Sequence, residues 1–127
     1  MVIFNVDVSK EEDLNLIKII RIAFEMKNDE NSKIIVERIK DAIPIAIDDD
    51  PDVICSGAEP EIIGNDIVFR EGLVLEKGGS IKIKITPRSK KYFTYNVLER
   101  EFRYYPMLIF KREGFDYIAY SLSLIHI

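Results

Sequence analysis

Histidine and cysteine each occur once in this 127-residue chain, as His126 and Cys55, and glutamine is absent. Histidine is the side chain that ordinarily titrates between pH 5 and 8. A single histidine near the end of the chain gives little means of building a Ser/His/Asp triad, a Cys/His dyad or a histidine-based metal site. One cysteine excludes an internal disulfide, which favours a reducing environment. We therefore expect a non-enzymatic, cytoplasmic protein without a bound cofactor.

Long apolar runs and a secretion signal are also missing from the sequence. No stretch approaches the roughly 18 apolar residues that span a bilayer, and the start MVIFNVDVSKEED has no basic region followed by an apolar stretch and a cleavage site. The hydrophobic fraction of 47% is too high for a disordered chain and suits one domain with a sizeable core. Abundant isoleucine, lysine and glutamate fit a thermophile or an AT-rich genome, and a small viral or mobile-element protein is a further expectation.

The last residues, LSLIHI from Leu122 to Ile127, match the translation of CTG TCT CTT ATA CAC ATC. That DNA is the transposon mosaic end used as a sequencing-library adapter. We therefore expect residues 122–127 to be foreign and residues 1–121 to form one domain that is truncated at its C-terminus, sequenced from mixed DNA. The alternative is a genuine last strand, because apolar and polar residues alternate from Tyr120 to Leu124.

The first third of the chain predicts one strand and two helices. VIFNVDV, from Val2 to Val8, alternates in the manner of a strand. Ser9 and Glu12 have the spacing of a capping box, which predicts a helix immediately afterwards. Apolar residues then recur at helical spacing, namely Leu14, Ile17, Ile20, Ala23 and Phe24. SKIIVERIKDA, residues 32–42, predicts a second amphipathic helix that ends before Pro44.

The remainder of the chain has the period of two that is typical of strands. Ile81, Ile83 and Ile85 alternate with two lysines, Gly78 and Gly79 can form a hairpin turn, and KREG at residues 111–114 predicts another. The sequence therefore predicts an α+β fold. We expect the N-terminal strand and an αα-hairpin to pack on one face of an antiparallel β-meander of about five strands.

Charge divides along the chain. Residues 1–66 contain 16 acidic and 7 basic side chains, and residues 67–121 contain 6 acidic and 11 basic ones. Opposite charges on two parts of one chain favour association with a protein partner, or head-to-tail homo-oligomers in which an acidic helical face meets a basic sheet face. A protein-interaction or self-assembly module is therefore one functional hypothesis.

The segment ITPRSKKYFTYNVLEREFRYY, residues 85–105, mixes cations with aromatic rings. Basic side chains along a backbone-tracking surface, with rings on which bases can stack, are how single-stranded nucleic acid is held without sequence readout. The candidate nucleic-acid-binding residues are Arg88, Lys90, Lys91, Tyr92, Tyr95, Arg100, Arg103 and Tyr104. The structural alternative is that the rings form the core and cross-strand pairs while the cations protect sheet edges.

The most acidic stretch is DDDPDVICSGAE, residues 48–59. Its candidate metal ligands are Asp48, Asp50, Asp52 and Glu59, which have the carboxylate spacing of an EF-hand loop. Val53 stands where that loop needs glycine, so a looser divalent-cation site is the better hypothesis, with a metal-dependent hydrolase as the corresponding function. No lysine after Asp52 has an acid two residues before it, which excludes a PD…(D/E)xK nuclease within this chain. A solvated loop is the structural alternative, and a buried, unreactive Cys55 is favoured over a nucleophile.

Overall fold

The computed structural model describes residues 1–47, 49–94, 104–114, 118–122 and 124–126, with the backbone alone described in the last two stretches. These residues form strands and no helix, so none of them forms a helix that could cross a membrane. The strands are β1 (Val2–Asp13), β2 (Leu16–Asn28), β3 (Ile34–Lys40), β4 (Asp52–Cys55), β5 (Glu61–Ile63), β6 (Asp66–Leu75), β7 (Ser80–Thr86), β8 (Phe93–Thr94), β9 (Met107–Arg112), β10 (Ile118–Leu122) and β11 (Leu124–His126).

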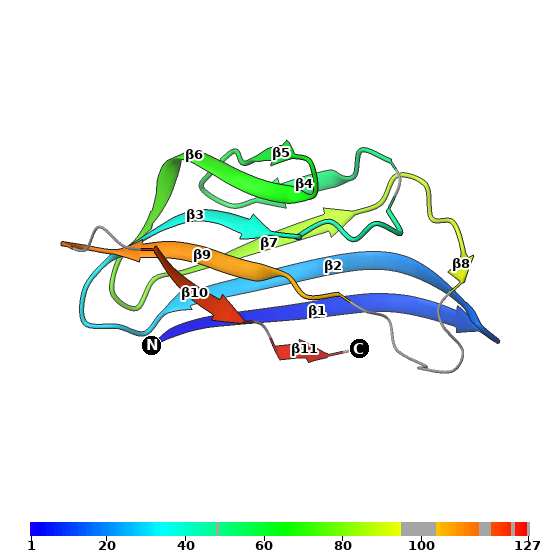
Figure 1. The fold of residues 1–127 in the computed structure, drawn as a ribbon, viewed down its shortest axis with the longest axis horizontal. Helices are drawn as coiled ribbons and strands as arrows, with labels where there is room; N and C mark the ends of the chain where they lie inside the picture. The colour runs from blue at the N-terminus through cyan, green and yellow to red at the C-terminus, as the bar shows by residue number, and fades with distance from the viewer. Residues whose placement is uncertain (48, 95–103, 115–117, 123, 127) are drawn as a thin grey trace.

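The strands form two sheets (Figure 1). Sheet A has the order β11-β1-β2-β7-β4, and β8 pairs with the first two residues of β2. Sheet B has the order β10-β9-β3-β6-β5. Neighbouring strands are antiparallel except for β1 and β11, which are parallel. The protein is therefore an all-β structure of two antiparallel sheets, and the predicted α+β fold is wrong.

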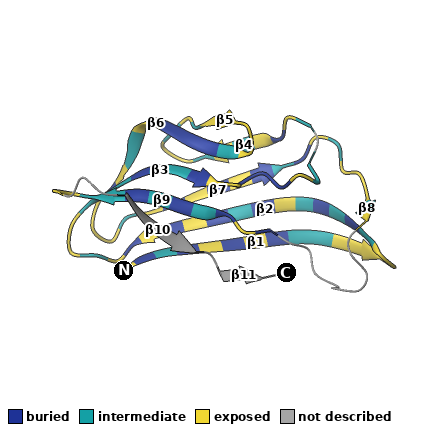
Figure 2. Ribbon diagram, viewed as in Figure 1, coloured by how far each residue is buried: buried dark blue, intermediate teal, exposed yellow. Residues whose placement is uncertain are grey.

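One hydrophobic core joins the inner faces of the two sheets. Buried and exposed segments alternate along β1, β2 and β7 (Figure 2), as expected for strands with one face packed and one face solvated. The largest fully buried side chains come from both sheets and are Phe24, Phe110, Ile17, Ile22, Met26, Ile34, Ile39, Ile67, Ile83, Ile85, Leu108 and Val6. Each sheet consequently keeps an outer face on which polar side chains can form a site.

Asn28 fixes the end of the molecule where the chain passes between the sheets. Its side chain is fully buried, and Nδ2 donates to the carbonyl oxygens of Ser32 and Leu75, each at 2.9 Å. Its backbone N–H donates to the carbonyl of Gly79 at 2.9 Å. Because Asn28 ends β2 and Leu75 ends β6, these bonds hold the β2–β3 and β6–β7 connections together.

The first predicted helix is instead the distal part of β1 and the whole of β2. Ile22, Phe24 and Met26 are buried at a spacing of two, as in a strand. Ile19 and Ile22 are also both buried although they lie three residues apart, because the β1–β2 register shifts between Ser9 and Lys10. A bulge of this kind inserts an extra residue and imitates helical spacing.

The second predicted helix is β3, and the same physical reason applies. Val36 and Ile39 are both buried, and the register of β3 against β6 and β9 shifts between Val36 and Arg38. The bulges therefore imitated helical spacing in two strands, although their many β-branched residues favour the extended conformation. Because the described residues form no helix, they contain no acidic helical face through which copies of the protein could assemble. Association with another protein stays a prediction.

Several predicted strands are confirmed. Val2, Phe4, Val6 and Val8 face the core from β1, and Ile81, Ile83 and Ile85 do so from β7. Gly78 has a φ of 76° in the β6–β7 hairpin, which is the conformation for which glycine was expected. The suspected adapter residues supply Leu122 to β10 and the whole of β11. Their foreign origin stays a prediction.

Candidate ligand-binding groove on sheet A

The outer face of sheet A carries two rows of polar side chains across β1, β2 and β7. Asn5 lies opposite Glu25, which in turn lies opposite Lys82. In the next row Asp7 and Lys84 are both in register with Ala23, which lies between them. These side chains point away from the core because their neighbours in sequence, such as Val6, Phe24 and Ile83, are buried.

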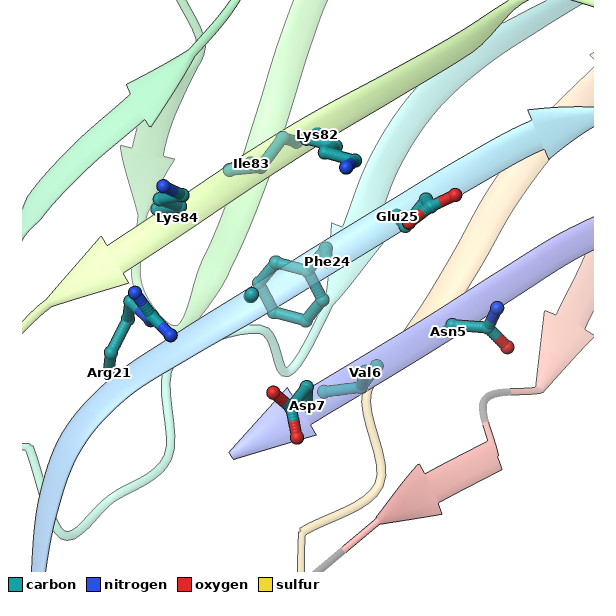
Figure 3. A pocket seen from close by; sticks show the side chains of 10 residues that line it. Asn5, Val6, Asp7, Arg21, Phe24, Glu25, Lys82, Ile83 and Lys84 are labelled. Carbon is teal, nitrogen blue, oxygen red and sulfur yellow. The ribbon is translucent and has the colours of Figure 1, made fainter. Parts of the chain in front are cut away.

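Ala23 forms the floor of an open groove of about 420 Å³ on this face. Around it lie Arg21 and Glu25 along β2, Asp7 across on β1 and Lys84 across on β7. Figure 3 shows Arg21, Lys84 and Asp7 toward one end of the groove, and Lys82, Glu25 and Asn5 toward the other. We call the depression bounded by Asn5, Asp7, Arg21, Ala23, Glu25, Lys82 and Lys84 the sheet A groove.

The charged side chains of the sheet A groove are not engaged with one another. Within the described part of the chain, none of its five charged residues forms an ion pair within 4.0 Å or a side-chain hydrogen bond; they are Asp7, Arg21, Glu25, Lys82 and Lys84. All five are exposed. A ligand can therefore contact the cationic donors and carboxylate acceptors of the groove without first breaking an ion pair between them.

Four of the predicted nucleic-acid-binding residues lie near one end of this face. Arg88 is paired with Asp52, with Nη2 of the arginine 3.1 Å from Oδ1 of the aspartate. Lys90 and Lys91 are exposed in the β7–β8 connection, and Tyr92 is 45% exposed. Arg88 is thus already matched by a carboxylate.

Lys18, on β2, extends the same face toward Tyr92. Its Nζ lies 4.8 Å from the centre of the Tyr92 ring and 3.2 Å from Oε2 of Glu11. The hydrogen bond with Glu11 raises the pKa of Lys18 above its ordinary value, so the amine stays charged at neutral pH. This cation–π contact orients the exposed ring.

The remaining predicted nucleic-acid-binding residues do not add to this surface within the described chain. Tyr104 is 4% exposed, and its hydroxyl donates a hydrogen bond to the carbonyl oxygen of Ala42. Burial, together with the charge of Asp41, raises the pKa of Tyr104, so the hydroxyl remains a protonated donor. Its ring belongs to the core and cannot stack on a base. Tyr95, Arg100 and Arg103 lie outside the described residues.

The predicted metal ligands do not form a metal-binding group where the structure describes them. Asp48 lies outside the described residues, Asp52 is paired with Arg88, and Asp50 and Glu59 are exposed. No three histidine, cysteine, aspartate or glutamate side chains of the described residues lie close enough together to hold a metal ion. Nearby, burial raises the pKa of the Cys55 thiol, which disfavours the thiolate that a nucleophile would need.

Sequence reasoning missed most of the groove. The outward direction of Lys82 and Lys84 followed from the alternation in SIKIKI, but Arg21, Ala23 and Glu25 were assigned to a helix. The alternation in VIFNVDV placed Asp7 on the face of the first strand opposite Val6 and Val8, without any sign of its neighbours on other strands. Recognising the bulge in β2 would have shown that Arg21, Ala23, Glu25 and Lys27 share one face.

Comparison with known proteins gives little further information. No family model matches the chain, and no curated protein matches it. Among solved structures, the chain is similar to part of an inactive mutant of the GH20 exo-β-N-acetylglucosaminidase from Vibrio harveyi, with 14% sequence identity and a TM-score of 0.49. The likeness covers 98% of this chain but 18% of the enzyme. A likeness at this level carries no inference about activity or ligand.

Proposed function

We propose that this protein is a non-enzymatic binding domain that holds single-stranded nucleic acid on the outer face of sheet A. The observation that carries the proposal is the group of three exposed cations, Arg21, Lys82 and Lys84, that share this face without a carboxylate within 4.0 Å among the described residues. Exposed cations attract a polyanion because its phosphates replace small counterions, whose release favours binding.

The spacing of the cations suits an extended chain of phosphates. Lys82 and Lys84 are two residues apart on β7 and point to the same side, so their Cα atoms are separated by about 6.6 Å. Arg21 adds positive charge from the neighbouring strand, on the outer face beyond Lys84. We assign the phosphate contacts to Lys82 and Lys84, which follow one another along a single strand.

The basic surface continues beyond β7 into the β7–β8 connection. Lys90 and Lys91 are exposed there, and the oriented ring of Tyr92 offers a face on which a base can stack. A nucleic acid that follows β7 toward β8 would meet cations first and then this ring. Sheet platforms that bind single strands without sequence readout combine these two elements.

Carboxylates of the same face oppose this binding in part. Glu25 lies opposite Lys82 in the register, and Asp7 lies on the other side of Ala23 from Lys84. Their charges weaken the attraction for phosphates along β1, so we expect the polyanion to follow the β7 side of the groove rather than to cross the sheet.

The proposal is tested by fluorescence anisotropy with labelled single-stranded oligothymidylate and oligouridylate of about 16 nucleotides. We expect binding that weakens steeply between about 50 mM and about 200 mM salt. The double variant Lys82→Gln/Lys84→Gln should bind more weakly and lower the slope of log K against log salt by roughly one for each lost phosphate contact. Absence of binding at low salt, or binding that is insensitive to salt, would overturn the proposal.

A matched control comes from the other sheet. Arg70→Gln/Lys111→Gln removes the same charge from the outer face of sheet B, where both side chains are paired with carboxylates. If the two double variants weaken binding equally, the attraction depends on net charge alone and the outer face of sheet A is not the site.

A further inference from the structure

The sheet A groove has an arrangement of charges that simple phosphate binding does not require. Ala23 has one charged neighbour in each of four directions: Arg21 and Glu25 along β2, Asp7 on β1 and Lys84 on β7. Two of these neighbours are cations and two are carboxylates. A phosphate seated over Ala23 would be repelled by both carboxylates, so this part of the face selects a neutral group that presents donors as well as acceptors.

The dimensions of the groove suit a flat ring lying over Ala23. Strands are separated by about 4.8 Å, so the backbones of β1 and β7 lie about 10 Å apart with β2 between them. Ala23 carries a single methyl group where its outward neighbours on β2 carry long charged side chains, and the resulting space is about 420 Å³. The floor is apolar and the edges are polar, which is the usual design of a site for a small planar group.

Guanine is the base that matches these edges. A carboxylate accepts hydrogen bonds and cannot donate them, whereas a guanidinium donates and cannot accept. Guanine presents two adjacent donors, the N1–H and the N2 amino group, and two adjacent acceptors, O6 and N7. Thymine and uracil lack an amino group, and the amino groups of adenine and cytosine have a ring-nitrogen acceptor beside them on the same edge.

We propose that the sheet A groove is a guanine subsite, with Asp7 accepting from N1–H and the N2 amino group, Arg21 donating to O6 and N7, and Ala23 supporting the ring. This assignment rests on the proposed binding of single strands and refines it. Lys82 and Lys84 remain available for the phosphates on either side of the recognised base. The protein then prefers single strands that contain an accessible guanine.

Synthetic bases test each contact separately. The probes are oligothymidylates of one length that carry at the centre thymine, guanine, hypoxanthine, which lacks the N2 amino group, or 7-deazaguanine, which lacks N7. We expect the guanine probe to bind about tenfold more tightly than the thymine probe. Replacing guanine by hypoxanthine or by 7-deazaguanine should remove a large part of this extra affinity. Asp7→Ala should abolish the difference between guanine and hypoxanthine while retaining the difference between guanine and 7-deazaguanine.

Ala23→Leu fills the groove and supplies a second variant whose fold can be checked by circular dichroism. It should lose the preference for guanine, so that its affinities for the guanine and thymine probes become equal. Equal affinity of the wild-type protein for all four probes would overturn the guanine subsite and leave the proposed function standing. Persistence of the preference in Ala23→Leu would likewise overturn it.

Free GMP and IMP separate this inference from the proposed function. If no oligonucleotide binds, the proposed function fails, and the groove is then tested by titrating each nucleotide while following the Ala23 methyl and Asp7 amide signals by NMR. Larger shifts with GMP than with IMP would support a guanine site for free nucleotides. The absence of shifts with either nucleotide would overturn the subsite as well.

Discussion

The outer faces of the two sheets differ in how their charges are matched. On sheet B three cations are paired with carboxylates: Arg38 with Asp66 at 3.2 Å, Arg70 with Glu61 at 2.6 Å, and Lys111 with Glu37 at 3.0 Å. At the centre of sheet A, no charged side chain of the described chain has such a partner.

Each face also has a depression of similar size. The one on sheet B, about 470 Å³, lies where β6 bulges away from β3, and its edge includes Arg38, Arg70 and Lys111. A hollow therefore does not by itself identify a binding site. Paired charges cancel much of their field toward a ligand, whereas unpaired charges retain it, so the comparison points to sheet A.

Charge reversal should separate the two faces most strongly. We expect Lys82→Glu/Lys84→Glu to weaken binding of a single-stranded oligonucleotide by at least about 100-fold at low salt, because two phosphate contacts become repulsive. The matched variant Arg70→Glu/Lys111→Glu on sheet B should change the affinity only a few-fold. Anisotropy titrations of folded variants measure both values, and a comparable loss in the two would remove the distinction between the faces.

Filling the two hollows should have unequal consequences for stability. Gly72, in the sheet B hollow, has a φ of 76°, and a Cβ there would lie 2.5 Å from Cγ2 of Ile35. Gly72→Ala should therefore lower the free energy of unfolding by about 2 kcal/mol. Ala23→Leu should change it by less than about 0.5 kcal/mol, because its side chain enters open space on an outer face.

Urea denaturation followed by circular dichroism measures both changes in stability. If Ala23→Leu proves as destabilising as Gly72→Ala, the sheet A groove is a packed structural element rather than a space kept for a ligand.

Removing a single carboxylate from the outer face of sheet A should strengthen oligonucleotide binding, by less than charge reversal weakens it. Glu25 lies across from Lys82 and opposes the approach of phosphates. Glu25→Gln should tighten the binding of the thymine probe about threefold, with the gain disappearing at high salt. Glu71→Gln, at an exposed position on sheet B, is the control and should leave the affinity unchanged. Weaker binding by Glu25→Gln would show that the carboxylate contacts the ligand and that the assumed path along β7 is incorrect.

The fold could be predicted from the sequence most directly where the period of two is uninterrupted. Val2–Val8 and Ile81–Ile85 were assigned to strands because their alternation is regular. β2 and β3 were mistaken for helices because each contains a bulge, at which two buried residues are three positions apart. Local spacing cannot separate a bulged strand from a helix; the register of the neighbouring strand decides it.

The candidate site was less accessible to sequence reasoning because it depends on distant contacts. Asp7, Ala23 and Lys84 meet through the pairing of three strands, and nothing near each residue indicates the other two. Tyr104 was expected to stack on bases, but it is buried against the carbonyl of Ala42, which lies 62 positions earlier in the chain. Composition shows that the segment is basic and aromatic, but it does not reveal which of its members face solvent.

Binding to the outer face of sheet A is tested most directly by an NMR titration of the ¹⁵N-labelled protein with a single-stranded oligonucleotide that contains one central guanine. The largest amide shifts should fall on Asn5–Asp7, Arg21–Glu25 and Lys82–Lys84, with smaller ones near Tyr92 and almost none at Arg38, Arg70 or Lys111. Shifts concentrated on sheet B, or spread evenly over both faces, would contradict it.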